Sequence, residues 1–262
     1  MKKLKYLLST ALVCVVSLSM ISCGTSNTAS TKKDVSLTIS AAASLKEAMT
    51  DIEPLFKEKY PNISLTFNYG ASGSLQQQIE QGAPSDVFIS AGKSQMTALS
   101  DKGLLTDGTN KDLVQNALVL VGPKNTTVTS LDDLTTDKVK KIAVGEPSSV
   151  PAGKYADESL TKLNIKDKVS SKLVQAKDVK EVLAWSTTGN ADVGFVYLSD
   201  AKSSPDAKVI ATVPENLHSK ITYPAAVIKA SANQDEAKEF EDFLYTDDAK
   251  AVFEKYGYTI AQ

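Results

Sequence analysis

The chain contains no arginine: all 29 basic residues among its 262 are lysines. A planar guanidinium that holds a carboxylate or an oxyanion through two parallel hydrogen bonds is therefore excluded from any site in this protein. Histidine is almost as scarce, since His218 is the only one. There is also no H-E-x-x-H motif, no cysteine pair and no EF-hand spacing, so the sequence predicts no directly coordinated metal cation.

Cysteine is limited to Cys14 and Cys23, and both lie near the N-terminus. Lysines in the first five residues precede an apolar run that ends at "MISC", a pattern that resembles a lipoprotein signal peptide. We expect residues 1–22 to be removed and Cys23 to become the lipidated first residue. The alternative is an ordinary secretory signal followed by an incidental cysteine. Because Cys14 lies within the removed segment, no intramolecular disulfide is predicted.

Residues 23–34 continue from that cysteine as a polar segment rich in small residues, typical of a flexible tether. Loss of residues 1–22 removes three lysines and takes the formal net charge from −2 to about −5. A mildly acidic chain without a basic run is a poor partner for nucleic acid. No later apolar run is long enough to cross a membrane. The expected location is outside the cytoplasm, at the cell surface or in the periplasm, with the lipid as anchor.

Strand-like and helix-like segments alternate along the chain, which favours the α/β class. Two lobes are the simplest arrangement, with lobe 1 built from residues 35–121 and 225–262 and lobe 2 from residues 122–224. The chain would cross between them near residues 122 and 224, and the C-terminal helices would pack on lobe 1. A ligand cleft is expected between the lobes. The predicted strands are 35–40, 63–69, 85–90, 116–123, 141–147, 171–177, 191–197, 208–214 and 223–230.

Several local signals predict where helices begin and end. Ser44 and Glu47 fit a capping box, so a helix is expected to start just after Ser44. Pro54 interrupts that helix and predicts a kink or a break. Gly82 is expected to end the helix over residues 74–82, and Asp178 is a plausible N-cap for the helix that follows it.

The stretch "GASGS" at residues 70–74 comes close to the nucleophile elbow G-x-S-x-G of serine hydrolases. Ser72 would be the nucleophile, and His218 would have to be its base. His218 stands in the polar segment "ENLHSK", however, and is expected to be an exposed surface residue. The same stretch lacks the lysine of a Walker phosphate loop. We therefore expect no catalytic residue. A secreted hydrolase that uses Ser72 is kept as the alternative.

Helix N-termini are the more promising feature. Ser44, Ser72, Ala152 and Val179 all lie at or near predicted helix starts, where unpaired N–H groups and the helix dipole favour anions. Each position taken alone is better explained as a plain helix start. Periodicity does not show whether these four positions converge.

Segments from residue 35 to the C-terminus resemble, in order, the periplasmic molybdate-binding proteins of ABC importers. The resemblance implies a type II periplasmic-binding-protein fold, action as a monomer, no enzymatic activity, and delivery of the ligand to a membrane permease. It rests on "AAASLKEAM", "YGASGSLQQQIEQGAPSDVFISA", "AVGEPSSVPAGKYADESL", "KDVKEVLAW", "GFVYLSDA" and "VFEKYGYTI".

In that family a tetrahedral oxyanion is held by neutral donors, and the resemblance transfers each donor to this chain. Ser44 and Ser72 would donate through hydroxyl and N–H, Ala152 and Val179 through N–H, and Tyr197 through its hydroxyl. The implied ligand is molybdate or tungstate, so the metal arrives as an oxyanion and no cofactor is needed. A site made only of donors has no acceptor for the proton of a protonated oxyanion. Sulfate, phosphate or another small oxyanion remains an alternative ligand.

Overall fold

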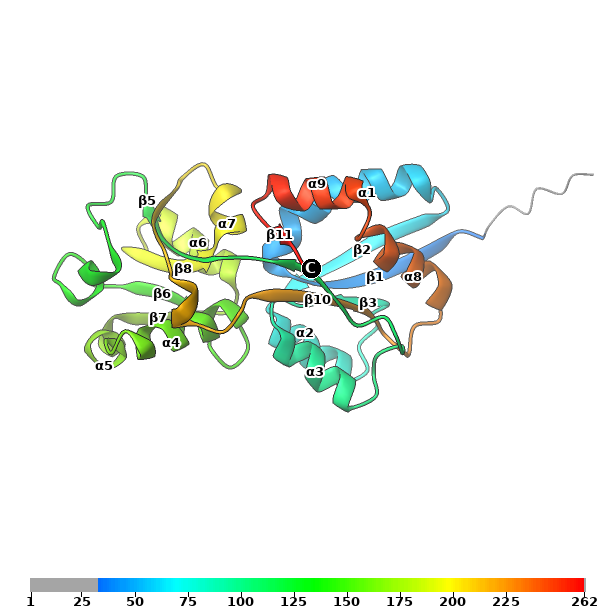
Figure 1. Cartoon of the computed structure of the whole chain (residues 1–262), viewed down its shortest axis with the longest axis horizontal. Helices are drawn as coiled ribbons and strands as arrows, with labels where there is room; N and C mark the ends of the chain where they lie inside the picture. The colour runs from blue at the N-terminus through cyan, green and yellow to red at the C-terminus, as the bar shows by residue number, and fades with distance from the viewer. Residues whose placement is uncertain (1–32, 262) are drawn as a thin grey trace, which may run out of the picture. The chain divides into compact units, whose positions relative to one another are not determined.

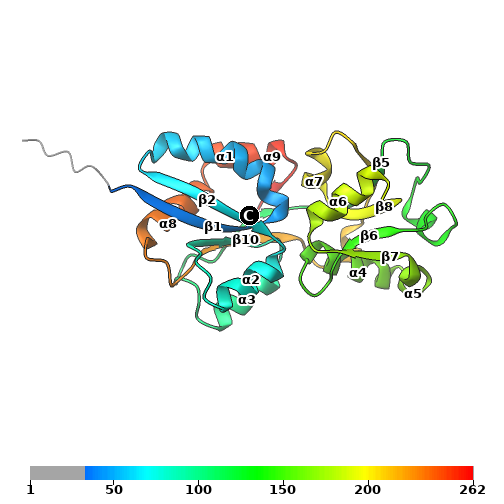
Figure 2. The same ribbon diagram turned by 180° about the vertical axis from the view of Figure 1, so that it is seen from behind.

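The structure is a computed structural model that describes residues 33–261, which form two α/β lobes, each with its own sheet, joined by crossing segments (Figures 1 and 2). The predicted signal peptide, Cys23 and nearly all of the predicted tether lie outside the described residues. Within residues 33–261, no helix is both long enough and apolar enough for a membrane crossing.

Lobe 1 is built on a six-stranded sheet in the order β11-β4-β10-β3-β1-β2. Helices α1, α8 and α9 cover one face of this sheet, and α2 and α3 cover the other (Figure 1). Its elements are β1 (Val35–Ala42), η1 (Ala43–Leu45), α1 (Lys46–Lys59), β2 (Ile63–Gly70), α2 (Ser72–Glu80), β3 (Val87–Ile89), α3 (Lys93–Asp101), β4 (Lys111–Gln115), β10 (Thr222–Val227), α8 (Gln234–Phe243), α9 (Asp247–Lys255) and β11 (Thr259–Ile260).

Lobe 2 is built on a five-stranded sheet in the order β7-β6-β8-β5-β9. Helices α6 and α7 lie on one face and α4 and α5 on the other (Figure 2). Its elements are β5 (Leu118–Pro123), η2 (Leu131–Thr135), β6 (Ile142–Gly145), α4 (Pro151–Lys162), α5 (Lys166–Val169), η3 (Ser170–Lys172), β7 (Leu173–Ala176), α6 (Val179–Thr188), β8 (Val193–Tyr197), α7 (Leu198–Lys202), β9 (Ala207–Thr212) and η4 (Glu215–Leu217).

The central strands are buried on both faces, which explains their continuous apolar runs. In lobe 1, β1 lies parallel to both β2 and β3, and in lobe 2 every residue of β8 is buried. Parallel strands require helical crossovers, and the loops after β1, β2, β6 and β7 each lead into a helix start. These four helix starts lie at the carboxyl ends of the strands, where α/β folds place their ligands. The predicted α/β class with two lobes is confirmed.

The crossings between the lobes lie earlier than predicted. Strand β5 pairs with β8 and β9 in the sheet of lobe 2, so the first crossing is at residues 116–117 and not near residue 122. The second crossing ends where β10 joins the sheet of lobe 1 at Thr222. Gly122 and Pro123, at the predicted crossing, instead end β5. Turn residues of this kind occur at strand ends as well as at lobe boundaries, which is why the prediction was misplaced.

Some local predictions are confirmed and others are wrong. Gly82 has a positive φ of 85° after α2, and the side chain of Asp178 accepts the Glu181 N–H at the start of α6. The capping box at Ser44 is wrong, because a 3₁₀ turn precedes α1 and Ser44 has a tertiary partner instead. Helix α1 is not broken at Pro54, since the buried face of the helix continues on both sides of the proline.

Candidate functional site

The five donors expected from the sequence line one small cavity between the two lobes. Its volume is about 10 Å³, close to the space of one water-sized sphere, and no charged side chain lines it. Four helix starts meet there, from η1, α2, α4 and α6. The lining residues are Ala42, Ala43, Ser44, Gly70, Ala71, Ser72, Ala91, Val150, Pro151, Ala152, Val179 and Tyr197.

Ser72 is the first residue of α2 and is only 1% exposed. Its Oγ accepts a hydrogen bond from the Ala91 N–H at 2.9 Å. Since that bond uses a lone pair of the oxygen, the hydroxyl hydrogen remains available for a partner in the cavity. The Ser72 N–H also belongs to the first turn of the helix, where backbone donors have no partner within the helix.

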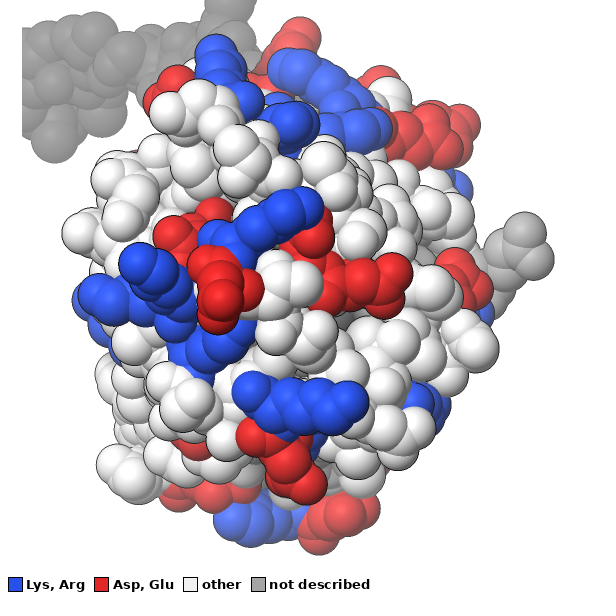
Figure 3. All heavy atoms as spheres, turned by 90° about the vertical axis from the view of Figure 1, so that its left-hand side faces the viewer, with Lys and Arg blue, Asp and Glu red and all other residues white. Residues whose placement is uncertain are grey.

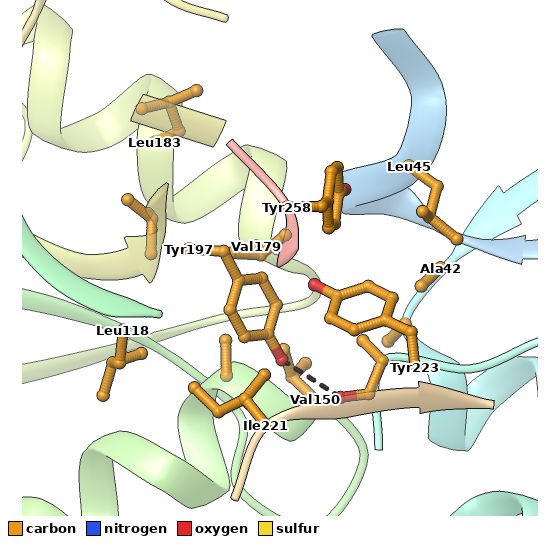
Figure 4. Packing of buried hydrophobic residues seen from close by; sticks show 14 of the residues in the cluster. Ala42, Leu45, Leu118, Val150, Val179, Leu183, Tyr197, Ile221, Tyr223 and Tyr258 are labelled. Atoms are coloured by element: carbon orange, nitrogen blue, oxygen red, sulfur yellow. Dashed lines mark hydrogen bonds between the residues drawn. The ribbon is translucent and has the colours of Figure 1, made fainter. Parts of the chain in front are cut away.

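Ser44 faces the same cavity from the 3₁₀ turn before α1. Its Oγ lies 2.9 Å from the hydroxyl oxygen of Tyr223 on β10, and its carbonyl accepts a hydrogen bond from Tyr258 at 2.8 Å. Figure 4 shows the rings of Tyr223, Tyr258 and Tyr197 grouped where the two lobes meet. Ser44 is thus held at both its backbone and its side chain.

In lobe 2, Ala152 is fixed by an unusually close approach of α4 to β6. A Cβ added to Gly153 would lie 1.9 Å from the Gly145 carbonyl oxygen, so only glycine allows this packing. Pro151 takes the first helical position, where its missing N–H costs nothing. The next N–H, that of Ala152, is therefore the first donor that α4 offers to the cavity.

Val179 is the first residue of α6. Asp178 uses its side chain to accept the N–H of Glu181, and Glu181 in turn accepts the N–H of Lys177. These bonds satisfy donors beside Val179 and leave its own N–H, in the first turn, without a partner within the helix. The end of α6 that lines the cavity is thus fixed in place by its own side chains.

Tyr197 ends β8 and is 1% exposed. Burial raises its pKa well above the usual value, so the hydroxyl stays protonated and can donate. In this structure the hydroxyl donates to the Ala91 carbonyl at 3.4 Å, a long bond drawn as a dashed line in Figure 4. A closer acceptor in the cavity would compete easily for that hydrogen.

The two lobes touch close in sequence to residues that line the cavity. The Gly73 N–H donates to the Ser149 carbonyl at 2.9 Å, and Glu47 Oε2 lies 2.5 Å from Lys180 Nζ. Gly73, in the first turn of α2, makes the first of these contacts. A Cβ there would lie 2.6 Å from the Ser149 oxygen, so the glycine permits contact between the lobes.

The hydrolase alternative finds no support in these positions. His218 is buried, not exposed as expected: its ring packs beside Tyr155 and its Nδ1 lies 2.8 Å from the Ser219 carbonyl oxygen. Among residues 33–261, no hydrogen bond joins Ser72 to His218, and each has another partner. The polar residues around His218 suggested an exposed loop, but α4 packs over this segment and buries the ring.

Sequence reasoning missed three residues behind the site, which are Asn116, Tyr223 and Tyr258. They come from both the first crossing and the C-terminal third of the chain. Tyr258 stands in the quoted segment "VFEKYGYTI", but nothing local in the sequence marks any of the three as a neighbour of Ser44. Ser74, two residues after Ser72, is half-buried in α2 and does not line the cavity. In the part of the chain that is described, no cluster of His, Cys, Asp and Glu is placed to hold a metal ion.

Comparison with known proteins identifies the family. The family model described as bacterial extracellular solute-binding protein matches residues 37–259. The chain belongs to this family. The molybdate-binding protein of Escherichia coli is 40% identical, with 86% of this chain and 89% of the relative covered. The resemblance inferred from the sequence segments is confirmed.

Two further relatives agree with this assignment. A Bacillus subtilis protein, named as a candidate ABC transporter substrate-binding lipoprotein, is 45% identical over 89% of this chain and 91% of its own. A solved substrate-binding domain of a candidate molybdenum ABC transporter from Clostridium difficile is 60% identical. The match covers 87% of this chain and 100% of that domain, with a TM-score of 0.69. The solute-binding family and its two-lobed fold are therefore established for this chain.

Proposed function

We propose that this protein is the extracytoplasmic binding component of an ABC importer and that it captures molybdate, and equally tungstate, in the cavity between its lobes. The observation that carries the proposal is the convergence of Ser44, Ser72, Ala152, Val179 and Tyr197 on one cavity without charged lining. Relatives named as molybdate-binding proteins support the choice of ligand.

The proposed site neutralises a dianion with dipoles alone. Five to seven charge-assisted hydrogen bonds, at about 1.5–3 kcal/mol each, would offset much of the desolvation of the anion. Sulfate carries the same charge and also lacks a proton, so we expect discrimination against it to come from size. A rigid set of donors spaced for the larger tetrahedron would lose bonds on a smaller one.

Closure of the lobes is the proposed mechanical step. The anion bridges the donors of both lobes and so favours the arrangement in which Gly73 meets Ser149 and Glu47 meets Lys180. The crossings at residues 116–117 and 213–221 would serve as the hinge. The closed protein would then present its ligand to a membrane permease, held near the membrane by a lipid on Cys23, and would act as a monomer.

No chemical step is part of this proposal, and no nucleic acid partner is expected. On the face of lobe 2 shown in Figure 3, lysines and acidic side chains are interspersed, and there is no continuous basic patch. A binding role also fits the relatives, which are named for what they bind and not for a reaction.

Calorimetric titration of the protein with molybdate, tungstate, sulfate and phosphate tests the proposal. We expect submicromolar binding of molybdate and tungstate and no comparable binding of sulfate or phosphate. Tight binding of sulfate or phosphate with weak binding of molybdate would show that the family fold serves another oxyanion here. Removal of His218 by His218→Ala should leave molybdate affinity unchanged, whereas the hydrolase alternative requires that residue.

A further inference from the structure

We infer that Asn116 and Tyr223, neither of which lines the cavity, orient the Ser44 hydroxyl so that its hydrogen points to the ligand, and that this relay disfavours oxyanions that carry a proton. The inference rests on the proposed function and adds two specificity-determining residues to it.

Asn116 lies at the first crossing between the lobes, and its amide orientation is fixed. Its Oδ1 lies 2.9 Å from the Ala117 N–H, which only an oxygen can accept. The Nδ2 group therefore points the other way, toward Ser199 Oγ at 2.9 Å and the Tyr223 hydroxyl oxygen at 3.4 Å. An amide nitrogen donates and does not accept, so the Tyr223 oxygen faces a donor on this side.

Tyr223 is fully buried on β10, and burial raises its pKa, so the hydroxyl keeps its hydrogen. A buried hydroxyl hydrogen needs an acceptor, because an unsatisfied one costs about 1–3 kcal/mol. The Ser44 Oγ, 2.9 Å away, is an acceptor for this hydrogen, whereas the Asn116 amide nitrogen is not. The hydrogen therefore runs from Tyr223 to Ser44.

Ser44 Oγ then accepts the hydrogen of Tyr223, so the single hydrogen of Ser44 needs an acceptor other than Tyr223. That hydrogen is left for the cavity, which Ser44 lines. Ser72 is set in the same way, but by the Ala91 backbone N–H. Both serines are thus donors before any ligand arrives, and only the arrangement behind Ser44 depends on side chains that can be changed.

The consequence concerns selectivity. Molybdate and sulfate carry no proton at neutral pH, whereas phosphate and arsenate carry at least one. A proton on the anion oxygen that faces Ser44 would meet the Ser44 hydrogen. Two hydrogens cannot bond to each other, so the protonated anion would lose this hydrogen bond. Without the Tyr223 hydroxyl, Ser44 could rotate and offer a lone pair to that proton.

The test measures affinities for molybdate and arsenate at neutral pH, by direct titration and by competition, and takes their ratio. Tyr223→Phe should weaken molybdate by about 3–10-fold and reduce the molybdate-to-arsenate preference by roughly tenfold or more. Asn116→Asp should reduce the preference in the same direction, because a carboxylate would accept the Tyr223 hydrogen and turn it away from Ser44.

Tyr258→Phe is the matched control, since Tyr258 packs against Tyr223 but donates to the Ser44 carbonyl and not to its hydroxyl. The Tyr258→Phe variant should prefer molybdate to arsenate by the same factor as the unsubstituted protein. An unchanged preference in Tyr223→Phe would overturn the relay, and so would an equal loss in Tyr258→Phe. If the unsubstituted protein binds sulfate and not molybdate, the proposed function fails, and the sulfate-to-phosphate ratio tests the relay in the same variants.

Discussion

The ammonium of Lys180 on α6 lies 2.5 Å from the carboxylate of Glu47 on α1 and 2.9 Å from that of Asp200 on α7, which is fully buried. One lysine therefore joins lobe 2 to lobe 1 and also neutralises a buried acid of its own lobe. Burial alone would lower the Lys180 pKa, but Asp200 and Glu47 outweigh it and raise that pKa. The pair with Glu47 exists only while the lobes are in contact.

Glu47→Gln should weaken molybdate binding, because it removes the ion pair between the lobes and leaves the Lys180–Asp200 pair intact. The pair is partly exposed, so we expect about 1 kcal/mol, or roughly fivefold in affinity. Asp51→Asn on the same helix is the control, since Asp51 pairs with Lys255 within lobe 1. Equal affinities for Glu47→Gln and the unsubstituted protein would show that this pair does not contribute to closure.

Gly73→Ala should separate stability from binding. Alanine near the start of α2 is a better helix former by up to about 1 kcal/mol, so the ligand-free protein should be as stable as before or more so. The added Cβ would lie 2.6 Å from the Ser149 oxygen and obstruct the contact between the lobes. Thermal unfolding without ligand and calorimetry with molybdate should therefore change in opposite directions. Undiminished affinity would contradict the proposed closed state.

Ser44→Ala, Ser72→Ala and Tyr197→Phe each remove one hydroxyl donor. We expect each variant to lose about 1–3 kcal/mol, or roughly 10–100-fold, in molybdate affinity. Ser74→Ala, two residues along α2 from Ser72 and outside the cavity lining, should bind as the unsubstituted protein does. Normal binding by all three cavity variants would mean that the donors are elsewhere.

The sequence predicted most of the strands, and the five residues that it proposed as donors are among the twelve that line the cavity, but it did not show what holds them there. Ser72 and Val179 stand in stretches whose strand-then-helix pattern is local, so the chain itself marks them. Tyr223 and Asn116 are 107 residues apart and meet only through the fold. The burial of His218 and the true partner of Ser44 depend on distant elements in the same way, and local polarity or a capping pattern suggested the opposite.

Glu241 on α8 provides a test of stability that is independent of the ligand. Its carboxylate is completely buried, neither oxygen has a hydrogen-bond partner within the described chain, and Lys111 Nζ is 3.8 Å away. Burial raises its pKa to about 7. Between about pH 4.5 and pH 7, the folded state keeps a proton on Glu241 that the unfolded state has lost. The contribution of Glu241 to the stability of the fold therefore falls as the pH rises through that range.

Glu241→Gln removes this titration. Chemical denaturation should show the variant to be more stable than the unsubstituted protein by about 3 kcal/mol above pH 7, with the difference disappearing toward pH 4. Asp242→Asn, which changes the exposed neighbouring carboxylate, should not reproduce that pH dependence. A constant difference between Glu241→Gln and the unsubstituted protein across this range would contradict the raised pKa.

A crystal structure of the protein with molybdate, using the anomalous signal of molybdenum, tests the central claim most directly. We predict one strong peak in the cavity, with the anion oxygens within hydrogen-bonding distance of the Ser44, Ser72 and Tyr197 hydroxyls and of the Ala152 and Val179 N–H groups. No lysine should contact the anion. A peak elsewhere, or an anion held by a lysine ammonium, would contradict a site built from neutral donors.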